Sequence, residues 1–256
     1  MSTYLETAVT AARAAGNLLR DHFGGELNVN AFAAHDIKLE LDEKAQELIT
    51  QMILQRHHDH AIYGEEGIGG NQDSEFQWIV DPLDGTVNYF YGIPHFCVSV
   101  ALRQKEEILV GVIYDPMREE LFTAELGGLA LLNGKPMAVS SRAQLSEAIV
   151  SVGLAKVAQT IDLGLPVMQD LIHRVRKCRM MGSAALDLAY VASGRLDAYI
   201  EAGVRIWDVA AGVLMVGNAG GKVVMTPRPD APEKITVVAS SGRIAQIAES
   251  SQRLTE

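Results

Sequence analysis

The chain has 256 residues and a formal net charge of −10, with 48% hydrophobic and 21% charged residues. These proportions are ordinary for a globular protein with a sizeable core. The acidic balance argues against a nucleic-acid backbone as the main partner, because such partners require clustered lysine and arginine. No apolar run approaches the roughly 20 residues needed to span a bilayer, and the first residues lack a secretory-signal pattern. We therefore expect a cytoplasmic protein without a membrane partner.

Two amphipathic helices are predicted at the start of the chain, over residues 4–23 and 41–55. In both segments apolar residues recur every three or four positions. The pattern then changes to short β-branched and aromatic runs, separated by glycine, proline and charged turns. These runs predict a largely antiparallel sheet with strands at 78–80, 96–102, 108–114 and 121–124.

From about residue 145 onward, strand-like and helix-like segments alternate, which favours layered α/β packing. The predicted strands are 148–152, 196–200, 222–225 and 235–239, and the predicted helices are 163–175, 185–192 and 208–216. No Pro-rich or Ser-rich linker separates the first half, 1–140, from the second half, 141–256. We therefore expect a single domain spanning residues 1–256.

The most informative stretch runs from Gln77 to Asn88 and holds two aspartates three residues apart. An apolar strand ends where Asp81 and Asp84 begin, and Pro82 stiffens the turn between them. Aspartate and proline are also ordinary turn residues, so a purely structural role stays open. Two carboxylates at the end of a core strand repel each other unless cations are present, and Mg²⁺ accepts such oxygen ligands.

Two further acidic positions bracket this stretch in the sequence. Glu65 and Glu66 follow a strand-like run, and Asp208 stands before an apolar helical segment. The glutamates could belong to a solvated loop, and Asp208 could be an acid at the start of a helix, stabilised by the helix dipole. Both interpretations stay open from the sequence.

Taken in order, three motifs resemble the signatures of the inositol monophosphatase family. They are Gly64-Glu65-Glu66, the run from Trp78 to Thr86, and Trp207-Asp208-Val209-Ala210-Ala211-Gly212. Further similar segments at 88–96, 132–134 and 182–188 extend the likeness over residues 41–221. The resemblance implies an α/β (α+β) fold, a layered α-β-α-β-α sandwich of the sugar-phosphatase type, and a homodimer.

The resemblance also implies roles for individual residues. The implied metal ligands for two or three Mg²⁺ ions are Glu65, Asp81, the carbonyl of Leu83, Asp84 and Asp208. The implied catalytic residues are Glu65, Thr86 and Asp42. The implied substrate contacts are Asp84, Gly85, Thr86, Gly182, Ser183, Ala184, Glu201 and Asp208, with Glu201 expected at the end of its strand.

The implied activity is Mg²⁺-dependent hydrolysis of a small polyol or sugar phosphate monoester by activated water. The resemblance favours inositol 1-monophosphate and implies sensitivity to lithium. Histidinol phosphate, a 3′-phosphonucleotide or fructose bisphosphate are alternatives with the same chemistry, because the ligands define the reaction and not the substrate. A non-catalytic binding module on the same fold is the alternative of another class.

Asp42 is the least regular of these positions. Members of the family commonly have a lysine about ten residues before such an aspartate and a threonine three residues before it. Here Ala31 and Phe32 occupy the first place and Leu39 the second. Asp42 is therefore expected either to orient Thr86 or simply to begin a helix.

Three other features are interpreted as structural. The segment 56–60, Arg-His-His-Asp-His, is expected to be a polar helix end. Cys97 and Cys178 are expected to be buried thiols, since no zinc spacing is present. The glycines at 127–128 and 217–221 are expected to form a hairpin turn and a helix end.

Overall fold

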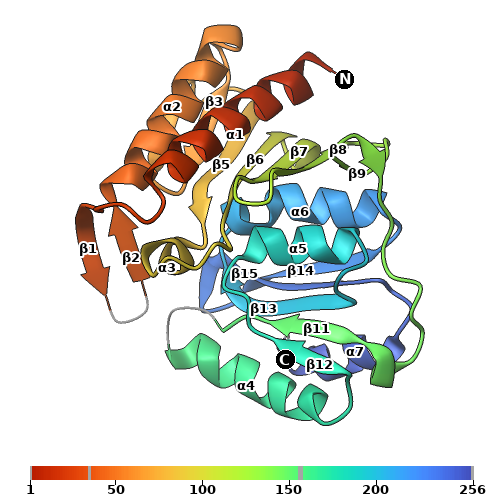
Figure 1. Cartoon of the computed structure of the whole chain (residues 1–256). Helices are drawn as coiled ribbons and strands as arrows, with labels where there is room; N and C mark the ends of the chain where they lie inside the picture. The colour runs from red at the N-terminus through yellow and green to blue at the C-terminus, as the bar shows by residue number, and fades with distance from the viewer. Residues whose placement is uncertain (1, 34–35, 155–157, 255–256) are drawn as a thin grey trace.

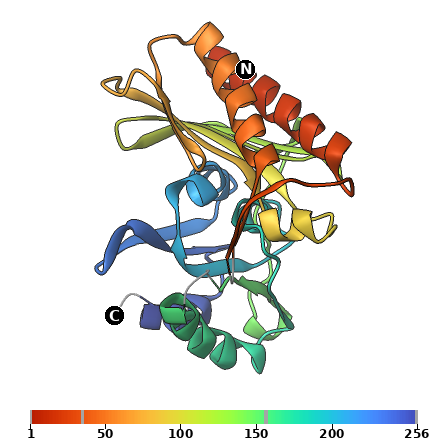
Figure 2. The ribbon, with the colours of Figure 1, turned by 90° about the vertical axis from the view of Figure 1, so that its left-hand side faces the viewer.

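The computed structural model describes residues 2–33, 36–154 and 158–254. Its elements stack in five layers, with helices outside, two sheets within, and a pair of helices between the sheets (Figures 1 and 2). The predicted α-β-α-β-α sandwich is therefore confirmed. Most predicted helices and strands correspond closely to the observed ones. The differences lie at the ends of elements and in short strands and helices.

The first layer consists of α1 (Thr3–His22) and α2 (Glu40–Arg56), which pack against each other and against the large sheet. The hydroxyl of Ser2 caps α1 by accepting from the Leu5 N–H at 3.2 Å. Alanines on the inner face of α1 are fully buried, and their small side chains let the helix lie close to the sheet. Both sequence predictions for these helices are confirmed to within a residue or two.

Eight strands form the large sheet in the described part of the chain, and all but one neighbouring pair are antiparallel. In spatial order they are β10 (Lys135–Pro136), β9 (Leu131–Leu132), β8 (Glu120–Glu125), β7 (Glu107–Asp115), β6 (Cys97–Gln104), β5 (Phe76–Asp84), β3 (Ala61–Gly64) and β4 (Gly67–Gly70). Helices cover both faces, which explains the unbroken apolar run in β5. Trp78 and Val80 face α1 and α2, whereas Ile79 faces the middle helices.

A bulge at the end of β5 decides where its two aspartates point. Asp81 pairs with Ser99 and Asp84 with Cys97, so one extra residue stands on the β5 side. In a regular strand, residues three apart face opposite sides of the sheet. The extra residue reverses that alternation, because a bulge re-aims the side chains that follow it. Asp81 and Asp84 consequently both face the middle helices.

The middle layer is formed by α5 (Ala184–Ala192) and α6 (Ile206–Asn218), which contact both sheets. Almost every residue of α5 is buried, as its apolar sequence requires for a helix covered on all sides. A Cβ on Gly212 would lie 2.4 Å from the Leu188 Cβ, so glycine allows the two helices to approach.

The small sheet has the order β12 (Lys177–Arg179), β11 (Ile149–Val152), β13 (Ala198–Val204), β15 (Ala231–Ser240), β14 (Lys222–Arg228). Its outer face is covered by α4 (Ala158–Ile172) and α7 (Ala245–Ser251). The sequence did not predict β12 or α7. It also placed the strand β13 too early, so Glu201 lies within this strand and not at its end.

The remaining elements complete the connections. A hairpin of β1 (Val29–Ala33) and β2 (Asp36–Leu39) leads into α2, and a short helix α3 (Thr86–Phe90) follows β5. Two 3₁₀ turns lie at Leu145–Glu147 and Gln252–Leu254. The predicted glycine turns are confirmed, since 127–128 join β8 to β9 and 217–221 end α6 before β14.

Two structural expectations need correction. The segment 56–60 does end α2, with His57 as the C-cap residue, but His57 and His60 are buried, and their rings stack at a centroid distance of 4.9 Å. The Trp78 Nε1–H donates to His60 Nδ1 at 3.1 Å, and Thr7 Oγ1 lies 3.0 Å from His57 Nε2. Cys97 is buried as expected, whereas Cys178 is only half-buried.

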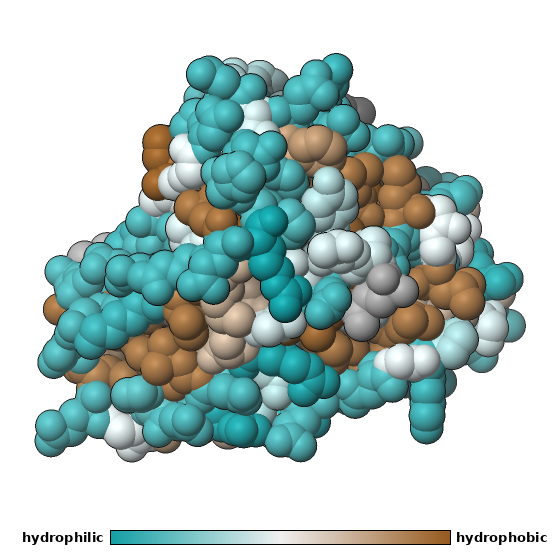
Figure 3. Space-filling model, turned by 90° about the horizontal axis from the view of Figure 1, so that it is seen from above, coloured by the Kyte–Doolittle hydropathy of each residue, from teal (hydrophilic) through white to brown (hydrophobic). Residues whose placement is uncertain are grey.

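Polar residues cover much of the face seen from above, where apolar residues occur in separate patches (Figure 3). None of the described helices combines the length and hydropathy that crossing a bilayer requires.

Candidate active site

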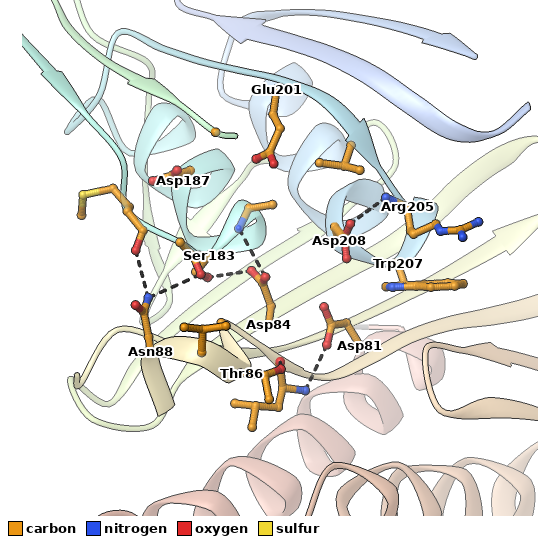
Figure 4. A pocket seen from close by; sticks show the side chains of 18 of the residues that line it. Asp81, Asp84, Thr86, Asn88, Ser183, Asp187, Glu201, Arg205, Trp207 and Asp208 are labelled. Atoms are coloured by element: carbon orange, nitrogen blue, oxygen red, sulfur yellow. Dashed lines mark hydrogen bonds between the residues drawn. The ribbon is translucent and has the colours of Figure 1, made fainter. Parts of the chain in front are cut away.

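A pocket of about 680 Å³ opens where the ends of β5 and β13 meet the first turns of α3, α5 and α6. Most of the predicted site residues line it, although they come from distant parts of the chain (Figure 4). The predicted residues gathered there are Glu65, Asp81, Leu83, Asp84, Gly85, Thr86, Gly182, Ser183, Ala184, Glu201 and Asp208.

Asp81 lies at the bottom of this pocket and is 1% exposed. Its Oδ1 accepts a hydrogen bond from the Leu83 N–H at 3.0 Å. Burial raises the pKa of Asp81 well above its ordinary value, and the neighbouring charges of Glu65, Asp84 and Asp208 raise it further. The carboxylate is therefore held where a positive charge would be strongly favoured.

Asp84 joins the end of β5 to the start of α5. Its Oδ2 accepts from the Ser183 hydroxyl at 2.6 Å and the Ala185 N–H at 2.7 Å, and its Oδ1 accepts from the Ala184 N–H at 3.3 Å. A carboxylate at a helix N-terminus satisfies N–H groups that have no partner within the helix and is stabilised by the helix dipole. The contact fixes the segment 182–184 against the large sheet.

Asp208 lies in the first turn of α6 and accepts from the Arg205 N–H at 2.6 Å. This is the helix-start role considered from the sequence, and it coexists with a place in the pocket. Burial raises the pKa of Asp208 well above its ordinary value, followed by the charges of Asp84 and Glu65. Asp81, Asp84 and Asp208 point toward the same space in Figure 4.

Glu65 stands in the tight turn between β3 and β4, which α2 holds in place. The Gln46 side chain accepts from the Glu66 N–H at 2.9 Å and donates to the Gly67 carbonyl at 3.0 Å. Glu66 in turn forms an ion pair with Lys38 of β2 at 3.0 Å. The turn is thus a supported structure and not a solvated loop.

Gly85 and Thr86 form the start of α3 at the pocket edge. Gly85 has φ +99°, and a Cβ there would lie 3.0 Å from the His95 carbonyl oxygen, so the position requires glycine. Thr86 donates its hydroxyl to the Leu83 carbonyl at 3.0 Å. Asn88 follows and donates to the Met181 carbonyl at 2.9 Å, which anchors the loop before α5.

Asp42 does not line the pocket. It is buried in the first turn of α2, where its Oδ2 accepts from the Leu39 N–H at 3.1 Å while its Oδ1 has no hydrogen-bond partner among the described residues. Burial raises the pKa of Asp42 to about 7. The Thr86 hydroxyl donates to the Leu83 carbonyl and not to Asp42. The expected contact between Asp42 and Thr86 is therefore not formed.

Several pocket residues were missed by sequence reasoning. Lys38, Asn88, Gly153 and Asp187 line the pocket, and only Asn88 and Asp187 lay in segments singled out for their family likeness. Gly153 is necessary because a Cβ there would overlap the Glu201 carboxylate. No sequence signal marks a glycine that makes room for a side chain on a neighbouring strand.

The donor set fits a divalent cation. Carboxylates and a backbone carbonyl are hard oxygen ligands of the kind Mg²⁺ prefers. Among the described residues, no three potential ligands are already drawn together as a complete metal site. Asp81, Asp84 and Asp208 each accept a hydrogen bond from a backbone N–H group.

A model of the inositol monophosphatase family matches residues 1–256. The chain belongs to the inositol monophosphatase family. It is 41% identical over 227 residues to "Nus factor SuhB" of Pasteurella multocida, covering 87% of this chain and 85% of that one. It is 38% identical over 226 residues to "Inositol-1-monophosphatase" of Mesorhizobium japonicum, with the same coverage of 87% and 85%.

The structure of the extragenic suppressor protein suhB from Bartonella henselae superposes with a TM-score of 0.89 at 34% identity, covering 100% of this chain and 99% of that one. Members of the inositol monophosphatase family are phosphatases that generally depend on metal ions and bind phosphorylated substrates. Family membership therefore supports a phosphatase, while the names of the relatives differ in the role that they state.

Proposed function

We propose that this chain is a Mg²⁺-dependent phosphatase that hydrolyses a small polyol phosphate monoester, with inositol 1-monophosphate as the leading substrate. The observation that carries the proposal is the convergence of Asp81 and Asp84 from β5 and Asp208 from α6 into one pocket. Burial raises the pKa of Asp81 and of Asp208, and the charge of Asp84 raises both further, so these carboxylates are costly unless a cation or a proton compensates their charge. A structural role alone would not require that cost.

Glu65, Asp81, Asp84, Asp208 and the Leu83 carbonyl would hold two or three Mg²⁺ ions. Bound Mg²⁺ supplies the positive charge that stabilises the phosphoryl group and makes water a better nucleophile near neutral pH. The bulge in β5 gives two of these ligands a common direction, and Pro82 restricts their motion. Both features would orient the two aspartates toward a common ion.

The remaining residues at this end of the pocket bind and orient the phosphate. The N–H groups of Gly85 and Thr86, and the Thr86 hydroxyl, are hydrogen-bond donors suited to phosphate oxygens. Glu65 would orient the attacking water, because its carboxylate accepts hydrogen bonds. Asp42 would act through the β3–β4 turn, because the charges of Glu66 and Glu65 add to the effect of burial in raising the pKa of Asp42.

The far end of the pocket favours an uncharged polyol. Glu201 lies on the side of the pocket away from Thr86 (Figure 4), and Gly182, Ser183 and Ala184 line the same pocket. An ionised carboxylate accepts hydrogen bonds and repels a second phosphate, so it suits a hydroxyl-bearing substrate. This favours inositol 1-monophosphate over fructose bisphosphate or a phosphonucleotide.

The direct test is a panel of phosphate monoesters assayed with Mg²⁺ and with excess chelator. Phosphate release that needs Mg²⁺ and is fastest on a polyol monoester supports the proposal. The matched variants are Asp81→Asn, which should abolish release, and Asp21→Asn, an exposed acid of α1 whose loss should change nothing. Full activity in chelator would refute the metal role.

The relatives' names favour a second candidate, a Nus factor role. The two functions are separable, because hydrolysis depends on the pocket carboxylates. If the chain has this second role, a strain of the source organism that carries Asp81→Asn should grow differently from a deletion strain, although the purified variant does not hydrolyse phosphate esters. Growth identical to the deletion strain would assign the whole phenotype to hydrolysis and so would also exclude the binding-module alternative.

Three finer properties complete the proposal: a homodimer, a cytoplasmic location and inhibition by lithium. They rest on the family likeness. Light scattering of the purified chain tests the first, fractionation of cells the second, and titration of LiCl into the polyol phosphate assay the third.

A further inference from the structure

Asp187 is a second acid at the far end of the pocket. It lies in the first turn of α5, lines the pocket and is 2% exposed. Its Oδ2 accepts a hydrogen bond from the Ser151 hydroxyl at 2.7 Å. Its Oδ1 is buried and has no hydrogen-bond partner among the residues that the structure describes.

A buried carboxyl oxygen without a partner is costly, because it has lost its hydration and gained nothing in exchange. Asp84, next to the same helix start, shows the contrast: both of its oxygens accept hydrogen bonds from Ser183, Ala184 or Ala185. The protein thus satisfies one acid at this helix end and leaves half of the other unsatisfied. A ligand that enters the pocket could supply the missing donor.

Asp187 and Glu201 are held in the same manner by the small sheet. Ser151 of β11 and Tyr199 of β13 are fully buried and stand opposite each other in the parallel register. Ser151 donates to Asp187, and the Tyr199 hydroxyl donates to Glu201 Oε2 at 2.6 Å. Each hydroxyl fixes one carboxyl group, and Gly153 leaves the room in which Glu201 lies.

We propose that Asp187 is a substrate-binding residue, and that Asp187 and Glu201 together accept hydrogen bonds from two hydroxyl groups of the substrate remote from its phosphate. This inference rests on the proposed phosphatase function and deepens it. It restricts the substrate class to monophosphates that carry at least two free hydroxyls on that side. A second phosphate there would meet two carboxyl groups and be rejected.

Basic side chains that line the same pocket suggest the opposite substrate preference. Arg205 and Lys234 also line it, and Arg205 lies 3.5 Å from Glu233. If these cations governed the far end, a bisphosphate would be the better substrate. Faster hydrolysis of fructose 1,6-bisphosphate than of inositol 1-monophosphate would therefore overturn the inference.

The experiment compares two substrates on wild type, Asp187→Ala and Asp187→Asn. For inositol 1-monophosphate, Asp187→Ala should raise KM by about tenfold or more with a smaller change in kcat, the effect of one lost hydrogen bond to a charged group. For phenyl phosphate, which has no hydroxyls, kcat/KM should change less than about twofold. Asp187→Asn has the same size and can still accept the hydrogen bond from Ser151, so its KM should rise less. This variant replaces Asp187→Ala in the test if the alanine variant does not fold.

Free myo-inositol provides a readout that does not depend on turnover of a polyol phosphate. It should inhibit phenyl phosphate hydrolysis by wild type and should inhibit the Asp187→Ala variant at least about tenfold more weakly. Ser151→Ala, which touches no substrate, should shift this inhibition in the same direction by a smaller factor.

Equal losses on both substrates, or unchanged inhibition by myo-inositol, would show that Asp187 is only a structural acid. These results differ from a failure of the proposed function. In that case wild type would release phosphate from neither substrate.

Discussion

Two clusters of buried titratable side chains in this protein have opposite characters. The pocket cluster contains Asp81, Asp84 and Asp208; burial raises the pKa of Asp81 and of Asp208, and the charge of Asp84 raises both further. The histidine cluster contains His57 and His60, stacked on each other and hydrogen-bonded to Thr7 and Trp78. Burial lowers the pKa of both histidines, so they remain neutral.

The comparison shows why a density of possible ligands in the sequence does not identify a metal site. The run His57-His58-Asp59-His60 looks richer in ligands than the run that holds Asp81, yet its buried members are satisfied within the core. The aspartates lie at the end of β5 and in the first turn of α6, where several elements face one open pocket. Only the second arrangement brings together buried acids whose negative charges a cation would compensate.

The largest expected effect tests the pocket cluster. Asp81→Asn and Asp208→Asn should each lower kcat at saturating Mg²⁺ by about 10³-fold or more, because each removes a charged ligand. In chelator both variants should be at least as stable to heat as wild type, since a repulsive charge is lost. Near-normal rates in both variants would break the contrast between the two clusters.

The next effect tests the histidine cluster. His60→Ala leaves the Trp78 Nε1–H without an acceptor and opens a cavity, so the free energy of unfolding should fall by about 2–4 kcal/mol. The kcat at saturating Mg²⁺ should be unchanged at a temperature where the variant is folded. His58→Ala, which alters an exposed neighbour, is the matched control. A changed Mg²⁺ requirement in His60→Ala would give the cluster a metal role.

A smaller effect is expected at Glu201. Glu201→Ala should weaken kcat/KM for a polyol phosphate by about 1–3 kcal/mol, the range for a lost hydrogen bond to a charged group. Hydrolysis of an aryl phosphate without hydroxyls should change little. If both substrates lose equally, Glu201 belongs with the ligand acids of the pocket cluster.

An effect of similar size, limited to high pH, concerns Asp42, a buried acid outside both clusters. Its pKa of about 7 means that between about pH 4 and 7 the folded chain keeps a proton that the unfolded chain has lost. The free energy of unfolding therefore falls as pH rises through this window. In chelator, Asp42→Asn should be more stable than wild type by about 1–3 kcal/mol at pH 8 and by little at pH 4. Denaturant unfolding at the two pH values measures this, and an equal difference at both would exclude titration of Asp42.

The sequence by itself determined most helices and strands and the motifs whose family resemblance implies the layers and the chemistry. Helical and strand periodicities predicted α1, α2 and most strands, because each element buries one face or both against its neighbours. The three acidic motifs predicted the ligand set, and the resemblance that they carry agrees with the family of the whole chain. The periodicities and the motifs are both local properties, because they depend only on the order and spacing of neighbouring residues.

Only the tertiary structure decided which side chains share the pocket and what satisfies them. The bulge in β5 depends on pairing with β6, so Asp81 and Asp84 could not be placed on one side from their spacing. The pairing of Ser151 with Asp187 joins residues 36 positions apart. Whether a buried polar group has a hydrogen-bond partner depends on how distant elements pack together, and no local sequence pattern specifies it.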